Sequence, residues 1–440
     1  MGLLLRLWFA TAHPLIDGDS FIYGEIAKNW FWHGVYGLTD QTGIRSTLIR
    51  LPGYPFFLGV CFRLFGLEHY RAILFTQIGF DLAACFFVAA FAARYISLRA
   101  GIVALYLAAL CPFTADYVAT PLAETLSIFC ISLALYSFGR YVEHPRINRW
   151  FFLLTFAISY AALLRPDGAL IGVVLLPAMF WFTRKQLSSM RAFRLAIFCA
   201  ALTLLPFFAW TVRNARTFHI FEPLAPRSAT DPGEFVATGW SDWAKTWCIE
   251  FTSTSEISWN VSGAPFPFED LPTRAFDSRV EYAQTAALAD AYNRTINLTP
   301  QMDAQFEQLA KERTARHPFR SYVVLPTLRL ADMWLRPRTE MFWMELRWWQ
   351  YRLHKSETIF AWSYAALNLA YLIAALCGLR KRVPFMYVMI AYTVLRCSLL
   401  LLTVDSPEPR YTLECFPMIF ILAAAALTAQ GRKEKSDNHL

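Results

Sequence analysis

The sequence contains few charged residues. Asp, Glu, Lys and Arg make up 17% of its 440 residues, whereas a soluble globular domain has about 25%. Apolar residues reach 56%, and Phe, Trp and Tyr alone make up 16%. A soluble chain of this composition would have no water-compatible exterior. The composition therefore excludes a disordered chain, a disulfide-stabilised miniprotein and an ordinary cytosolic enzyme, and part of the chain must lie in hydrocarbon.

The signatures of cytosolic chemistry are also missing. The sequence has no phosphate-binding P-loop, no Gly-rich dinucleotide turn and no nucleophile elbow. Its eight His show no metal-ligand spacing, and its nine Cys fall mostly inside apolar runs, so no disulfide framework is readable. The net charge of +8 does not indicate a nucleic-acid partner, because in a membrane protein the placement of positive charge carries the information.

Long apolar runs predict an all-α polytopic membrane protein with about ten transmembrane helices. The runs lie near 71–93, 100–114, 121–139, 150–164, 168–183, 194–212, 358–379, 384–403 and 411–429. An apolar stretch at 3–10 is shorter than the roughly 20 residues that a span needs. We expect the chain to begin partway through a first helix, and we recognise no cleavable signal peptide.

The distribution of positive charge predicts the orientation of these helices. Alternate connections hold nearly all the cations: Arg94, Arg99, Arg140, Arg146, Arg149, Arg184, Lys185, Arg191, Arg194, Arg380, Lys381, Arg382 and those of the C-terminal tail. The other connections contain CPFTADYVAT, LLRPDG and TVDSPEPRY, with only Arg165 and Arg410. Positively charged connections face the cytoplasm, which places 13–70 and 213–357 outside.

Three regions follow from this topology. Residues 1–212 form an N-terminal transmembrane module that includes the outer loop 13–70. Residues 213–357 form a large extracytoplasmic region, in which 277–316 is predicted to be helical and soluble. Residues 358–440 provide the C-terminal transmembrane helices and a cytoplasmic tail. Within the first loop, the short apolar stretch 54–66 is predicted to be an interfacial helix.

Several acidic residues are candidates for chemistry. Asp17 and Asp19 flank Gly18, and a carboxylate pair at this spacing can bind a divalent cation or supply a general base. Alternatively, Asp19 caps a helix that starts at Ser20. Glu124 lies at the outer edge of a span, where it either complements the helix dipole or serves function. Asp81 lies deeper and is expected to pair within the bundle, with Gln77 as the nearest candidate.

Arginines recur on the outer side, where the positive-inside rule disfavours them. They are Arg50, which precedes Leu-Pro-Gly-Tyr-Pro, and Arg165, Arg213 and Arg410 at helix ends. Single interfacial arginines are usually anchors that extend towards headgroups. Together, however, these four would form a site for an anionic group, because the planar guanidinium binds phosphate through two donors.

The order of these motifs resembles the polytopic GT-C glycosyltransferases, in particular the dolichyl-phosphate-mannose protein mannosyltransferase superfamily, which includes bacterial lipid A aminoarabinose transferases. The matching features are the block from Asp19 to Tyr23, Arg50 before Pro52-Gly53-Tyr54-Pro55, Glu124, Arg165-Pro166, Trp210 to Asn214, and Arg410-Tyr411. The resemblance extends from residue 17 to about 429. The chain departs from the family in its short N-terminus and in Asp17, which leaves open whether a metal ion binds at Asp17 and Asp19.

The resemblance implies a GT-C-like bundle and transfer of a sugar from a polyprenyl-phosphate donor to a glycan, lipid or protein acceptor. It implies catalytic roles for Asp19, Asp17 or Glu124, and donor phosphate binding by Arg50, Arg410, Arg165 and Arg213. Tyr23, Tyr54 and Tyr411 would position substrate. Direct displacement would invert the anomeric configuration, and the expected location is the outer face of a bacterial inner membrane, in contact with membrane lipids.

Two other functions fit the composition. A transporter or flippase of lipid-linked saccharides would also have about ten spans and outer acids, but it should carry ionisable residues near the membrane midplane. A non-catalytic scaffold would bind an exopolysaccharide through residues 213–357, and substitutions at Asp19 and Arg50 would then be silent.

Overall fold

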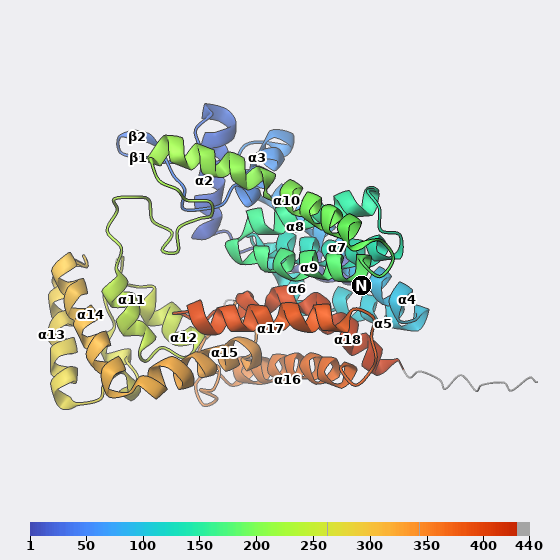
Figure 1. Ribbon diagram of the computed structural model, residues 1–440. Coiled ribbons are helices and arrows are strands. Elements are labelled where there is room, and N and C mark those ends of the chain that lie inside the picture. Colours follow the sequence, from blue (N-terminus) through green and yellow to red (C-terminus); the bar gives the residue numbers. More distant parts are fainter. Residues whose placement is uncertain (262, 343, 429–440) are drawn as a thin grey trace, which may run out of the picture.

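The computed structural model describes residues 1–261, 263–342 and 344–428, and it is mostly helical (Figure 1). The predicted cytoplasmic tail lies outside the described residues from 429 onward. The long apolar helices form one bundle. A smaller group of helices, called here the outer domain (residues 238–335), lies at one end of that bundle. This arrangement confirms the predicted all-α polytopic fold.

Every predicted span is present as a helix. The bounds are α4 (Tyr70–Tyr95), α5 (Leu98–Ala109), α6 (Pro112–Ala115) with η1 (Asp116–Ala119), α7 (Glu124–Glu143), α8 (Arg149–Leu164), η2 (Pro166–Ala169) with α9 (Leu170–Thr183), α10 (Ser189–Phe218), α16 (Lys355–Gly378), α17 (Met386–Thr403), and η7 (Pro409–Cys415) with α18 (Phe416–Leu427). Among the described residues, seven helical segments are long and apolar enough to cross a membrane, and a bent pair, α5 with α6 and η1, makes an eighth. The expected ten also include α1 (Gly2–Ala12) and α8, which are apolar but shorter.

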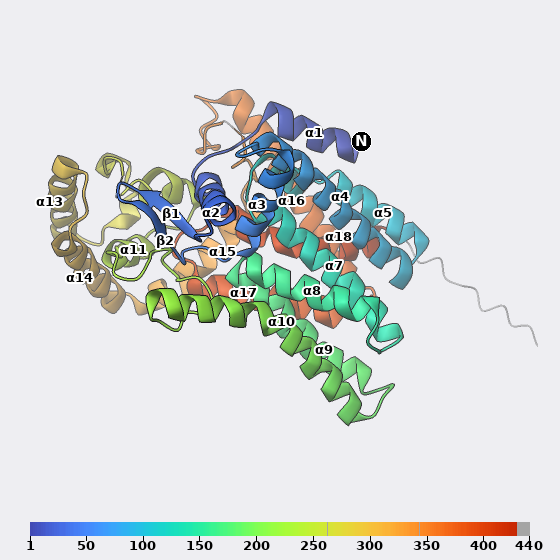
Figure 2. The same cartoon turned by 90° about the horizontal axis from the view of Figure 1, so that it is seen from above.

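The helices of the bundle differ in how much of their surface the protein covers. Within its most apolar window, α7 is 83% buried, whereas α16 is 22% buried and exposes large apolar side chains such as Trp362 and Ile373. We infer that α7 lies at the centre and that α16 faces lipid, since apolar surface is stable there. Viewed from above, α9 and α10 lie on one side of the bundle, away from α4 and α5 (Figure 2).

The first outer loop folds into a compact unit. It contains α2 (Asp19–His33), a two-stranded antiparallel hairpin of β1 (Gly37–Asp40) and β2 (Gly43–Ser46), and α3 (Gly53–Phe65). Helix α3 corresponds to the predicted helix at 54–66. The hairpin was not predicted, because four residues per strand are too few for a readable alternation of polar and apolar side chains.

The outer domain has a core of its own. Its elements are α11 (Thr238–Lys245), α12 (Phe251–Ser253), η3 (Thr254–Ser258), η4 (Phe268–Asp270), η5 (Thr273–Ala275), α13 (Arg279–Thr295), α14 (Pro300–Arg316), η6 (Arg320–Val324) and α15 (Leu325–Leu335). Trp243, Trp247 and Phe306 are buried between these elements. Helices α13 and α14 confirm the helical prediction for 277–316.

The buried partner of Asp81 differs from the prediction. Asp81 accepts a hydrogen bond from Arg6 Nε at 2.5 Å, and both side chains are almost fully buried. Gln77 instead accepts a hydrogen bond from the Tyr54 hydroxyl at 2.7 Å. The prediction was wrong because Arg6 belongs to a segment too short to be recognised as part of the bundle. Its ion pair joins α1 to α4.

Candidate active site

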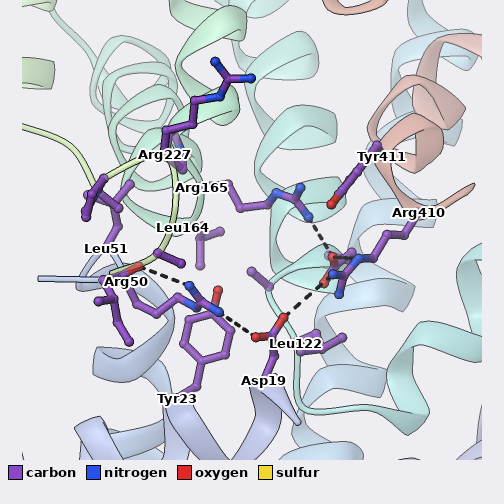
Figure 3. Close-up of a pocket in the computed structure, with 17 residues that line it drawn as sticks. Asp19, Tyr23, Arg50, Leu51, Leu122, Leu164, Arg165, Arg227, Arg410 and Tyr411 are labelled. Atoms are coloured by element: carbon purple, nitrogen blue, oxygen red, sulfur yellow. Dashed lines mark hydrogen bonds and ion pairs between the residues drawn. The ribbon is translucent and has the colours of Figure 1, made fainter. Parts of the chain in front are cut away.

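A cavity of about 450 Å³ opens at the end of the bundle that carries the outer domain (Figure 3). Its wall combines parts of the chain that are far apart in sequence. The charged and aromatic residues that line it are Asp19, Tyr23, Arg50, Glu124, Arg165, Arg227, Arg410 and Tyr411. Most of these are the acids and arginines that the sequence analysis selected, and their convergence confirms that they lie on one side of the membrane module.

Asp19 lies at the centre of this wall. It is the first residue of α2, but its side chain makes no capping hydrogen bond, so the capping interpretation is wrong. The carboxylate instead accepts a hydrogen bond from Arg50 Nη2 at 2.6 Å and lies 3.7 Å from Arg410 Nη2. Burial raises the pKa of Asp19, but the charges of Arg50 and Arg410 outweigh burial and hold the pKa below its ordinary value.

The motif after Arg50 explains how that arginine is positioned. A Cβ added to Gly53 would lie 2.5 Å from the carbonyl oxygen of Leu163, so only glycine allows α3 to approach the end of α8 this closely. The Tyr160 hydroxyl donates to the Gly53 carbonyl at 3.0 Å and closes the contact. Arg50 therefore faces Asp19 and the cavity, and not the lipid headgroups.

Glu124 begins α7 and is 3% exposed. Its carboxylate accepts a hydrogen bond from Arg165 Nη1 at 2.7 Å and lies 3.8 Å from Arg410 Nε. A carboxylate at a helix N-terminus is favourable for the dipole alone. Here it also joins two guanidinium groups from the end of α8 and from η7, and so fixes both of them in the wall of the cavity.

Arg410 and Tyr411 both bind Glu408. Arg410 Nε lies 2.5 Å from Glu408, and the Tyr411 hydroxyl donates to the same carboxylate. The Arg165 guanidinium lies 5.5 Å from the centre of the Tyr411 ring. The segment that enters the last span thus holds Arg410 between Asp19 and Glu124.

A second layer of ion pairs lies behind the cavity, and sequence reasoning missed it. Arg396 is 1% exposed, donates to Asp167 at 2.9 Å and pairs with Glu414. Asp167 also lies 3.2 Å from Arg165 Nε. The signal that could have identified this layer is Arg396 itself, since an ionisable residue inside a predicted span is a functional candidate.

Three of the predicted site residues do not line the cavity. Asp17 is exposed, because Gly18 has φ of +42° and turns the chain so that Asp17 and Asp19 separate. Arg213 donates to the backbone carbonyls of Thr47 and Tyr36 and fastens α10 to the hairpin. Tyr54 is fully buried and binds Gln77.

Arg227, which the sequence analysis did not select, does line the cavity. It belongs to a segment without helix or strand, called here the strap (residues 219–237), between α10 and α11. Its side chain is 69% exposed and pairs with Asp405 at 3.1 Å. No pattern in the surrounding sequence sets this arginine apart.

The predicted cation site at Asp17 and Asp19 does not fit this geometry. Divalent cations such as Mg²⁺ and Ca²⁺ need several oxygen ligands, but Asp17 points away from the cavity and Asp19 is held by arginine. Within the part of the chain that the structure describes, no group of three or more His, Cys, Asp or Glu residues has metal-binding geometry. We therefore assign no step to a metal ion at this pair.

Comparison with known proteins agrees with this site, and the class of the protein is a GT-C membrane glycosyltransferase. Residues 50–210 match the family described as dolichyl-phosphate-mannose-protein mannosyltransferase, which confirms the resemblance inferred from the motifs. The matched segment contains Arg50, Glu124 and Arg165, whereas Asp19 and Arg410 lie outside it. No curated protein matches the chain significantly.

Solved structures with a similar arrangement include two membrane enzymes. ArnT from Cupriavidus metallidurans, solved bound to undecaprenyl phosphate, is 15% identical with a TM-score of 0.39, and the match covers 97% of this chain and 75% of that chain. The archaeal oligosaccharyltransferase AglB from Archaeoglobus fulgidus, solved with an inhibitory peptide and a dolichol-phosphate, is 11% identical with a TM-score of 0.49, and the match covers 97% of this chain and 49% of that chain.

Proposed function

We propose that this protein transfers a sugar from a polyprenyl-phosphate donor to an acceptor hydroxyl, with inversion, at the outer face of a bacterial inner membrane. The observation that carries the proposal is the position of Asp19, which lies between Arg50 and Arg410 in a cavity at the outer end of the bundle. A site there lets the lipid tail of the donor remain in the bilayer while its sugar reaches water.

The charge of the cavity suits a phosphate leaving group. Four guanidinium groups and two carboxylates line it, an excess of two positive charges. The donor phosphodiester carries one negative charge, and the departing polyprenyl phosphate monoester carries up to two. Interactions that strengthen as this charge develops accelerate the reaction. Arg50 and Arg410 are the phosphate-binding residues in this proposal, with Arg165 and Arg227 beside them.

The reaction is a single displacement. The acceptor oxygen forms a bond to the anomeric carbon, and the bond from that carbon to the phosphate oxygen breaks. The electron pair leaves with the polyprenyl phosphate, and the acceptor proton moves to the Asp19 carboxylate. Because the acceptor attacks opposite the leaving phosphate, the anomeric configuration inverts.

Donor binding would also activate Asp19. In the free protein the two arginines keep its carboxylate ionised but weakly basic. A bound donor phosphate would share the same guanidinium groups and so reduce their hold on Asp19. Its pKa would then rise towards the acceptor, and the base would become effective only when the donor is in place.

Transport is less consistent with the bundle. In the described residues, the cavity beside Asp81 measures about 10 Å³, which is room for about one water molecule. A lipid-linked sugar would need a far larger passage, so the outer cavity supports transfer at one face.

A vesicle assay tests this proposal. Purified protein is incorporated into vesicles with polyprenyl-phosphate sugars that carry a labelled sugar of known anomeric configuration. We expect release of polyprenyl phosphate together with a new glycosidic bond of the opposite configuration. Movement of the labelled donor across the bilayer without bond cleavage would contradict the proposal, and retention of configuration would contradict the single displacement.

A further inference from the structure

A second cavity adjoins the first. It measures about 990 Å³ and lies between the outer domain and the outer end of α17. The two cavities share Arg165, Pro166, Arg227 and Tyr411 in their walls. A molecule in the second cavity would therefore be next to the proposed site of bond formation.

The second cavity carries the opposite charge. Asp167, Asp242 and Asp405 line it with two arginines, an excess of one negative charge. Lys245 lies 2.6 Å from Asp405 and neutralises part of this charge from behind the wall. An acceptor with several phosphate groups would be repelled here, whereas a neutral molecule would not.

Hydroxyl groups and aromatic rings make up much of the remaining wall. The hydroxyl-bearing residues other than Tyr411 are Ser228, Thr230, Thr238, Ser241, Ser258, Thr403 and Ser406. Trp259 is 50% exposed and Phe235 is 47% exposed, although both are large apolar side chains in an aqueous region. Exposed aromatic surface beside polar groups is typical of a binding site.

We propose that the second cavity binds the acceptor and that the acceptor is an oligosaccharide without net negative charge. The C–H faces of a sugar would pack on the rings of Trp259 and Phe235, and its hydroxyls would donate to Asp242 and exchange hydrogen bonds with the serine and threonine side chains. This inference rests on the proposed function, because the reacting hydroxyl must pass the shared wall to reach Asp19.

Binding is tested without turnover. We would measure saturation-transfer NMR on the full chain in nanodiscs with three neutral linear tetrasaccharides, chitotetraose, cellotetraose and maltotetraose. We expect saturation of at least one of them, and at least about tenfold weaker binding for Trp259→Ala. Trp349→Ala is the matched control, since Trp349 is equally exposed at 49% but does not line the cavity, and its binding should equal that of the wild type.

Several results would overturn the inference. They are no saturation of any tetrasaccharide, equal binding by the two tryptophan variants, or transfer of the labelled sugar to lipid A or to a peptide in the vesicle assay. Failure of the proposed function has a different signature. In that case polyprenyl phosphate is not released with any acceptor, although the NMR measurement still reports tetrasaccharide binding.

Discussion

Asp19 and Arg50 illustrate how neighbouring charges set reactivity at the scale of single residues. Asp19 is partly buried, which by itself favours the neutral acid, yet two arginines hold it ionised. The same arginines are the groups that a donor phosphate would bind. One set of contacts therefore links donor binding to the strength of the base.

Replacing Arg50 should change the pH profile. With Arg50→Gln, burial of Asp19 is opposed mainly by Arg410, so the pKa of Asp19 should rise. Since the base acts only when deprotonated, activity is lost as the pH falls through this pKa. We expect the acidic limb of kcat/KM to move to higher pH by about one pH unit or more. The same profile for Arg63→Gln, an exposed arginine of α3 outside the cavity, should not move.

The sequence identified the chemistry of the site better than its membership. Asp19, Arg50, Glu124 and Arg410 were predictable because charged residues are rare at the outer ends of apolar runs. Asp17 and Asp19 could not be separated, because the backbone conformation at Gly18 decides which carboxylate faces the cavity. Arg227 was not predictable because it lies in the strap, whose path depends on contacts with distant residues such as Asp405.

At the scale of elements, close contacts between helices place these side chains. The approach of α3 to α8 at Gly53 brings the turn with Arg50 next to the end of α8, from which Arg165 extends. The periodicity of apolar residues predicted both helices, but it carries no information on which helices touch. Only the unusual Pro-Gly pair marked the contact.

Gly53→Ala should separate these two helices. The added methyl group would meet the backbone of Leu163, which cannot rotate away as a side chain can. We expect a loss of about 1–3 kcal/mol in the free energy of unfolding and a lower rate of sugar transfer. Gly79→Ala is a suitable control because nothing lies within 4 Å of its added Cβ. If both variants behave alike in thermal unfolding and transfer, the contact has no such role.

The Arg6–Asp81 pair gives a second prediction at this scale. Arg6→Met leaves Asp81 as an unpaired charge inside the bundle, which should cost about 3–5 kcal/mol. Arg6→Met combined with Asp81→Leu removes both charges and should recover most of that loss. Unfolding in nanodiscs measures both variants. A double variant no more stable than Arg6→Met would show that the pair is not the main contact of α1.

The whole molecule has two different ends. Acids and arginines converge at the outer end, and the connections rich in arginine lie at the other. The spans and their orientation were predictable because the bilayer imposes both hydrophobic length and charge asymmetry on the sequence. The outer domain follows no such constraint, so its cavities depend on tertiary contacts that no local pattern reveals.

Cysteine labelling tests this orientation. Gln301 in α14 and Lys185 between α9 and α10 are both exposed. In spheroplasts, a membrane-impermeant maleimide should label Gln301→Cys at once and Lys185→Cys only after permeabilisation. The unsubstituted chain serves as the control for the native cysteines. Immediate labelling of Lys185→Cys would place the arginine-rich connections outside and contradict the proposed topology.

The central claim is that Asp19 is the base that receives the acceptor proton. The most direct measurement is the single-turnover rate of sugar transfer for Asp19→Asn and Asp17→Asn, each at equal membrane abundance. The account predicts a loss of about 10²–10⁴-fold for Asp19→Asn and a rate near that of the wild type for Asp17→Asn. A near-normal rate for Asp19→Asn, or a comparable loss for Asp17→Asn, would contradict it.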